Sequence, residues 1–156
     1  MSGCRYLQMI NIKTLSFNSL HFPVVNKRIE LNAFVIMSNH IHLIWQTLPG
    51  YEPSDVQLSF MRYTAQQIKF ELMKDNPALL EKCKVNKVDR AYQIWKRESL
   101  GIELFTKAVF NQKLEYIHYN PVKADLCIYP EDYYYSSAYF YEYGGNDFNM
   151  LTHCQG

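Results

Sequence analysis

The sequence lacks several features that would place it in a protein class directly. Its four cysteines show no CxxC spacing, which argues against a zinc knuckle or a disulfide framework and favours a reducing, cytoplasmic location. No apolar run approaches the length of a membrane span, so we expect no signal peptide and no membrane partner. The net charge is only +1, whereas DNA-binding domains are usually more basic. Binding to nucleic acid would therefore depend on local basic patches.

The chain also lacks internal repeats, linkers and low-complexity runs, apart from a cluster of tyrosines near its C-terminus. Its 156 residues, 48% of them hydrophobic, predict one compact domain over 1–156. Residues 1–28 carry weak patterns: 6–12 suit a short strand, 13–20 suit one or two turns of helix, and Pro23 argues against a long helix here. Residues 130–156 form a tail rich in aromatic side chains.

Residues 32–46 are the most informative stretch. Two apolar runs, 33–37 and 43–45, flank the turn residues Ser38 and Asn39, a pattern that predicts a β-hairpin. His40 and His42 are two residues apart, and alternate residues of a strand point to the same face. Two adjacent imidazoles can share one divalent cation, but two histidines can also share a sheet face by chance. The motif gains meaning only with a third ligand and a nucleophile.

Residues 111–126 could supply both. The apolar spacing predicts a core-packed helix over about 102–120, with a loop at Thr106 before it as the alternative start. Pro121 is expected to end or bend this helix. Tyr116 and Asn120 are four apart and so lie on one face of that helix. The Tyr116 hydroxyl could act as a nucleophile and the Asn120 amide oxygen as a metal ligand. Alternatively, Tyr116 is an ordinary half-buried packing residue.

Three segments, AFVIMSNHIHLIW, EYIHYNPVKADL and YPEDYYYSSAYFY, occur in an order that resembles the single-tyrosine HUH transposases, in particular the REP-associated tyrosine transposases and their insertion-sequence relatives. The resemblance implies an α+β, ferredoxin-like fold, with an antiparallel sheet and helices packed on one face. By position, His40 and His42 match the paired histidines, Tyr116 the nucleophile, and Asn120 the residue that completes a Mg²⁺ or Mn²⁺ site. The implied activity is DNA transposition: cleavage and rejoining of single-stranded DNA through a 5′-phosphotyrosine.

The N-terminal region departs from this family, which has a central first strand and a full helix before the histidine hairpin. Here, only the chain from about Asn18 onward resembles the end of that helix. Either residues 6–12 supply the strand in an unusual way, or the sheet is incomplete, or a second chain fills the gap. One alternative to an active enzyme is therefore a single-stranded-DNA-binding module that kept the fold and lost cleavage. Another is a metal-dependent phosphodiesterase in which water attacks.

The resemblance implies single-stranded DNA next to a small hairpin as the partner, and relatives work as homodimers or as monomers. A helix is expected from Ser54, begun by a capping box with Gln57, to about Lys74. A short strand is expected over 92–97, in which Trp95 either stacks on a base or packs in the core. Candidate basic contacts to DNA are Arg62, Lys69, Arg90, Lys96, Arg97, Lys113 and Lys123.

Overall fold

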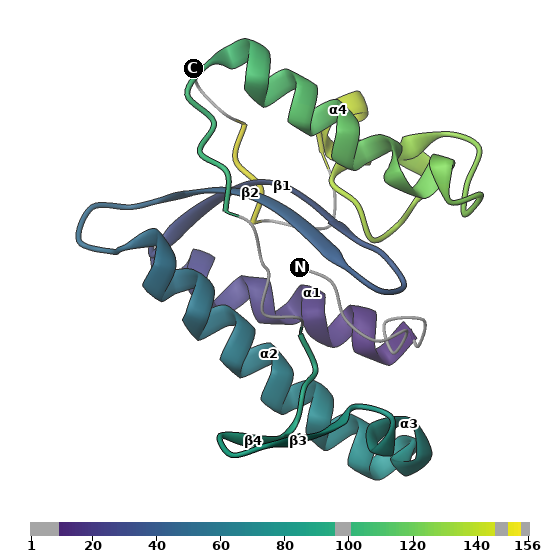
Figure 1. Ribbon diagram of the computed structural model, residues 1–156. Coiled ribbons are helices and arrows are strands. Elements are labelled where there is room, and N and C mark those ends of the chain that lie inside the picture. Colours follow the sequence, from purple (N-terminus) through teal and green to yellow (C-terminus); the bar gives the residue numbers. More distant parts are fainter. Residues whose placement is uncertain (1–9, 96–100, 146–149, 154–156) are drawn as a thin grey trace.

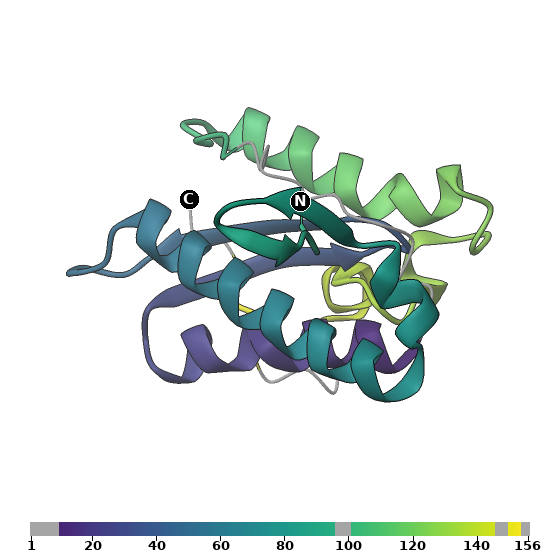
Figure 2. The ribbon, with the colours of Figure 1, turned by 60° about the horizontal axis from the view of Figure 1, so that its bottom comes forward.

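The computed structural model describes residues 10–95, 101–145 and 150–153. Its centre is an antiparallel hairpin of β1 (Ile29–Ile36) and β2 (Ile41–Thr47). The helices α1 (Ile10–Val25) and α2 (Pro53–Asp75) lie on one side of the hairpin, and α4 (Lys107–Lys123) lies on the other (Figures 1 and 2). The expected hairpin is confirmed, as is the α+β class. Helices cover both faces of the sheet, so the prediction of helices on one face alone is wrong, and a ferredoxin-like fold is not confirmed.

The smaller elements follow the two ends of this framework. A short helix α3 (Pro77–Glu81) and a second antiparallel pair, β3 (Lys84–Lys87) with β4 (Arg90–Tyr92), continue from the end of α2. The 3-10 helix η2 (Pro130–Asp132) and the helix α5 (Ala138–Tyr143) belong to the aromatic tail. The strand predicted over 92–97 instead covers Arg90–Tyr92, and Lys96 and Arg97 lie outside the described residues.

β1 is buried on both of its faces because helices cover each side. A bulge between Leu31 and Ala33 shifts the pairing with β2 by one residue. Leu31 and Phe34 therefore share the face that packs on α1 and α2, although their spacing is odd. Beyond the bulge the faces alternate: Ile36 lies in the same core as Phe34, and the core under α4 contains Ala33, Val35 and Met37.

Both prolines that were expected to stop helices lie inside them. α1 continues through Pro23 to Val25, and α4 continues through Pro121 to Lys123. Each proline stands in the last turns of its helix and its ring is buried, so packing offsets the loss of one backbone hydrogen bond. Residues 10–12, at the end of the predicted N-terminal strand, are helical.

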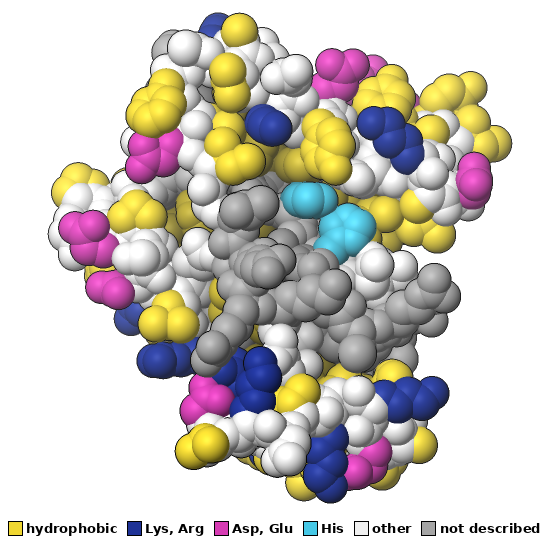
Figure 3. Space-filling model, in the orientation of Figure 1, with side chains coloured by type: hydrophobic (Ala, Val, Ile, Leu, Met, Phe, Trp, Pro, Cys, Tyr) yellow, Lys and Arg dark blue, Asp and Glu magenta, His cyan; other side chains and the backbone are white. Residues whose placement is uncertain are grey.

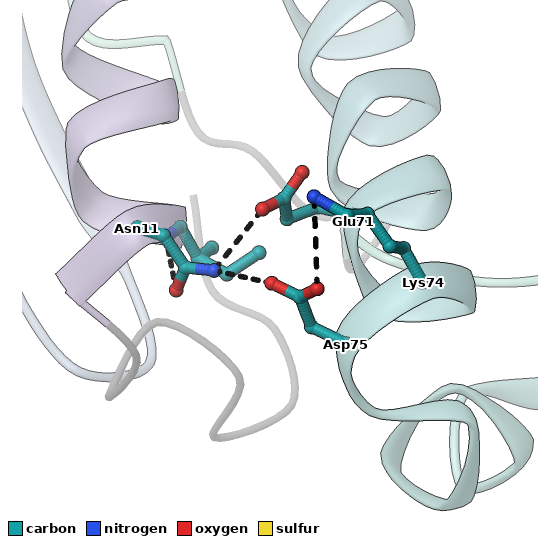
Figure 4. A network of polar contacts seen from close by, with 5 residues as sticks. Asn11, Glu71, Lys74 and Asp75 are labelled. Atoms are coloured by element: carbon teal, nitrogen blue, oxygen red, sulfur yellow. Dashed lines mark hydrogen bonds and ion pairs between the residues drawn. The ribbon is translucent and has the colours of Figure 1, made fainter.

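The start of α2 differs from the predicted one, and a side-chain contact joins the other end of α2 to α1. α2 starts at Pro53, one residue before the predicted Ser54, and its N-cap Glu52 makes no side-chain capping bond, so the expected capping box is not the start of the helix. The Asn11 amide donates hydrogen bonds to Glu71 (3.1 Å) and Asp75 (3.0 Å), which joins the start of α1 to the end of α2 (Figure 4).

The outer edge of β1 is covered by the tail of the same chain. The Ile36 amide donates to the Tyr135 carbonyl, and the amides of Ser137 and Thr152 donate to carbonyls of β1, each over 2.9 Å. These bonds satisfy backbone groups that an exposed edge strand would leave open to another chain. The sequence left open whether residues 6–12 or a second chain supplies a strand beside the hairpin, or whether the sheet is incomplete. The described tail covers this edge of the hairpin.

One hydroxyl joins the tail, the hairpin and α4. Ser137 Oγ accepts a hydrogen bond from the Phe34 amide (3.0 Å) and donates to the Phe34 carbonyl (3.2 Å). The same oxygen lies 2.9 Å from Nε2 of His118, a buried residue of α4. Because a serine has only one proton to give, His118 must donate through an Nε2–H group. Burial lowers the pKa of His118 to about 4, so the ring is neutral and holds this tautomer.

We expect Ser137→Ala to lower the free energy of unfolding by roughly 2–4 kcal/mol, because it leaves two buried N–H donors without an acceptor. Urea unfolding followed by circular dichroism measures the change. Ser59→Ala is the control, since Ser59 is exposed on α2 and its loss should change stability by less than about 0.5 kcal/mol. Equal stability of the two variants would show that the Ser137 hydroxyl does not anchor the tail.

Candidate metal and nucleophile site

The two histidines meet at the start of β2, on the face that α4 covers. Their ring centroids are 4.8 Å apart. His42 pairs across the hairpin with Val35, and paired residues of neighbouring strands share a face. Val35 belongs to the core under α4, so the histidine face is the α4 face. Figure 3 shows two adjacent histidine side chains at the surface of the molecule.

Tyr116 lies next to this pair, although 74 residues separate it from His42 along the chain. The rings of His42 and Tyr116 are 5.7 Å apart between centroids and meet edge to face. The Tyr116 side chain is 48% exposed, so its hydroxyl can be reached from solvent. The structure thus brings together three of the residues that the sequence singled out, from the hairpin and from α4.

One of the two predicted DNA-contacting lysines of α4 lies over the Tyr116 ring. The Lys123 ammonium is 5.3 Å from the centroid of that ring. Lys123 is seven residues after Tyr116, which is two helical turns and therefore the same side of α4. Lys123 was predicted as a DNA contact, but its place on the Tyr116 side of the helix was missed because Pro121 suggested that the helix ends before it.

Asn120 lies one helical turn after Tyr116, and its Nδ2 donates to the Tyr116 carbonyl over 2.9 Å. The amide oxygen accepts no hydrogen bond within the described part of the chain, so it is available as a ligand. Among the described residues, no group of three or more His, Cys, Asp or Glu side chains could hold a metal ion. Within the described residues, a metal at the histidine pair would therefore take a third protein ligand of another type, such as the Asn120 amide oxygen.

The histidine pair itself fits a divalent cation. Asn39 Oδ1 can only accept, so the 2.7 Å contact with His40 Nδ1 fixes the proton there and leaves Nε2 as a free lone pair. Burial lowers the pKa of both rings, and for His42, where the neighbouring His40 adds to the effect, the pKa falls to about 4. Both imidazoles are thus neutral near pH 7. Metal–nitrogen bonds of about 2.1 Å place two ring centres roughly 4.5–5 Å apart, which the observed spacing matches.

A groove of about 740 Å³ runs from His42 along β2. Its other walls are the first turn of α2 and the segment 101–105. Phe105 is 83% exposed there, and the amides of Gln46 and Gln57 also line the groove. Phe105 was not among the predicted DNA contacts. Its position directly before Thr106 could have indicated an exposed ring at the start of a helix, because the Thr106 hydroxyl caps α4 by accepting from the Val109 amide.

Only some of the predicted DNA contacts lie near the candidate site. Lys113 and Lys123 are on α4, near Tyr116, whereas Arg62 and Lys69 are on α2 and Arg90 is on β4, on the other side of the hairpin. The Arg90 guanidinium pairs with Asp89, and the Lys69 ammonium lies over the ring of Tyr92.

Trp95 is only 5% exposed, and its indole N–H donates to Thr64 Oγ1 over 2.9 Å. A ring held in the core cannot stack on a base, so the structure contradicts the predicted DNA contact for Trp95 and supports its alternative role in packing.

Comparisons with protein-family models, with curated proteins and with solved structures find no match to this chain. None of the helices in the described residues combines the length and the apolar character needed to cross a membrane.

We expect the protein to bind Mn²⁺ with one ion per chain, because two neutral imidazoles and an amide oxygen form a set that suits this cation. Isothermal titration should show that His42→Ala and Asn120→Ala each weaken binding at least tenfold. His21→Ala is the matched control, since His21 is exposed on α1 and distant from the pair in the chain. Unchanged affinity in His42→Ala would locate the ion elsewhere.

Proposed function

We propose that this protein cleaves and rejoins single-stranded DNA in a metal-dependent reaction, as a transposase of the single-tyrosine HUH type does. The observation that supports this most is the contact of His40, His42 and Tyr116, with ring spacings of 4.8 and 5.7 Å. These residues belong to separate sequence motifs that carry the resemblance, and in the structure they lie next to one another. Two histidines that share a sheet face by chance are not expected also to contact an exposed tyrosine.

In the proposed reaction the Tyr116 oxygen attacks the phosphorus of a phosphodiester. The bond from phosphorus to the 3′ oxygen breaks as the tyrosine–phosphorus bond forms, and the phenol proton is lost while the departing 3′ oxygen gains one. The product is a 5′-phosphotyrosine and a free 3′ hydroxyl. The reverse attack by a 3′ hydroxyl rejoins the strand and releases the phenol, so the cycle needs no nucleotide cofactor.

The side chains of the site have separate tasks in this reaction. His40, His42 and Asn120 would hold the cation, which when bound neutralises charge on the non-bridging phosphate oxygens. The Lys123 ammonium lies 5.3 Å from the centroid of the Tyr116 ring, where it would bind a phosphate oxygen of the strand. α4 holds Tyr116 and Asn120 on one rigid element, which limits the motion of nucleophile and ligand relative to each other.

The groove beside His42 suits the strand that would be cut. Its amide side chains can hydrogen-bond to the edges of unpaired bases, and Phe105 offers an exposed ring on which a base can stack. Such stacking does not depend on net charge, which agrees with a chain whose formal charge is only +1.

The decisive test is a covalent adduct on a denaturing gel. Oligonucleotides that carry hairpins, incubated with protein and Mn²⁺ or Mg²⁺, should give an adduct that disappears in Tyr116→Phe. Tyr119→Phe is the matched control, because Tyr119 is a similarly exposed tyrosine of the same helix. An adduct that persists in Tyr116→Phe would refute the assigned nucleophile. Bound oligonucleotide without any adduct would support the binding module in place of the enzyme.

The groove makes a separate prediction. In the Tyr116→Phe background, Phe105→Ala should weaken binding of single-stranded DNA by about 1–3 kcal/mol, the usual contribution of one stacked base. Fluorescence anisotropy with a labelled oligonucleotide measures this. Phe70→Ala serves as the comparison, since Phe70 is exposed on α2 and does not line the groove. Equal affinities of the two variants would remove Phe105 from the DNA path.

A further inference from the structure

Arg28 has an unusual environment at the corner between α1 and β1. Its Nε is buried and has no hydrogen-bond partner in the part of the chain that the structure describes. Within the described residues its guanidinium forms no ion pair, and its contacts are with two aromatic rings instead. The central carbon of the guanidinium lies 5.0 Å from the ring centroid of Phe22 and 5.7 Å from that of Tyr51.

This arrangement is costly unless an acceptor is supplied from elsewhere. A buried donor without a partner is destabilising, and most buried polar groups in folded proteins are satisfied. The two rings attract the positive charge through their faces, but they do not give Nε a hydrogen bond. Arginine binds oxyanions such as carboxylate and phosphate with two parallel hydrogen bonds, and one of these can use Nε.

Arg28 also lines a cavity of about 290 Å³ with mostly apolar walls. Phe22, Phe60 and Tyr63 supply aromatic rings to it, and Pro23 and Val56 supply aliphatic surface. The rings of Phe22 and Tyr63 are 52% and 50% exposed, so they can be reached from solvent. The volume is at the lower end of the range for small-ligand pockets, and a single planar ring fits it.

We propose that this cavity, the Arg28 pocket, binds one unpaired nucleotide, with the base among the aromatic rings and the phosphate on the Arg28 guanidinium. The choice of a nucleotide rests on the proposed function, because single-stranded DNA supplies unpaired bases joined to phosphates. Arg28 precedes β1, and His40 follows its far end, so the eight-residue strand separates the pocket from the histidine pair by roughly 25 Å. The pocket is thus a second contact for nucleic acid, away from the nucleophile.

The test compares three small probes by isothermal titration with the whole chain. Thymidine monophosphate should bind at least tenfold more tightly than thymidine, which lacks the phosphate, and than inorganic phosphate, which lacks the ring. Arg28→Met keeps the apolar stem and removes the guanidinium, and should weaken binding of the nucleotide at least tenfold. Lys74→Met is the control, because Lys74 is exposed on α2, does not line the pocket and is not among the predicted DNA contacts. Circular dichroism verifies that both variants fold.

Two results would overturn the proposal: equal affinity for thymidine and its monophosphate, or unchanged nucleotide affinity in folded Arg28→Met. If Arg28→Met fails to fold, Phe22→Ala gives a second test, with the same tenfold loss expected and unchanged affinity counting against the pocket. Oligothymidylate separates a nucleotide of a strand, for which Arg28→Met weakens the oligonucleotide as well, from a free nucleotide, for which only the monophosphate is affected. Nucleotide binding without a Tyr116 adduct would refute the proposed function alone, and an adduct without nucleotide binding would refute the pocket alone.

Discussion

The hydroxyl of Ser137 holds the parts of this protein in register. It bonds to both backbone groups of Phe34 in β1 and to the His118 ring in α4, so the tail, the hairpin and the helix meet at one oxygen. His118 is two residues after Tyr116, which places the two side chains about 200° apart around the helix. One side of α4 is therefore fixed to the tail while another presents Tyr116 to the histidine pair. The rings of His42 and Tyr116 lie 5.7 Å apart there.

The hairpin depends on its surroundings in a more general way. Two strands alone are marginally stable in water and leave both faces and both edges open. Here α1 and α2 bury one face, α4 buries the other, and the tail hydrogen-bonds to the outer edge of β1. The candidate site lies at the turn that leads into β2, next to α4. Its ligands stand on a strand and its tyrosine on a helix, and both elements are held by packing.

The parts of the fold that follow local rules could be predicted from the sequence. Period-two spacing gave the hairpin and the shared face of His40 and His42, and the apolar stripe gave α2. The errors arose where tertiary contacts override local preferences. Pro23 and Pro121 are tolerated because their rings are buried. Trp95 packs in the core, where its indole N–H donates a hydrogen bond to Thr64. The hydrogen bonds from the tail to β1 connect residues about 100 positions apart, and no local pattern in the sequence predicts them.

A net charge of +1 is low for a DNA-binding protein, but the placement of the cations matters more than their sum. Three of the basic side chains in the described residues, Lys74, Lys84 and Arg90, pair with neighbouring acids. Arg28 and Lys123 instead lie over aromatic rings, one beside a cavity and the other beside the candidate nucleophile. A protein organised in this way would hold a strand through a few localised cations, a bound metal ion and stacked bases. Counterion release would contribute little to its affinity, so a nearly neutral chain is compatible with the proposed reaction.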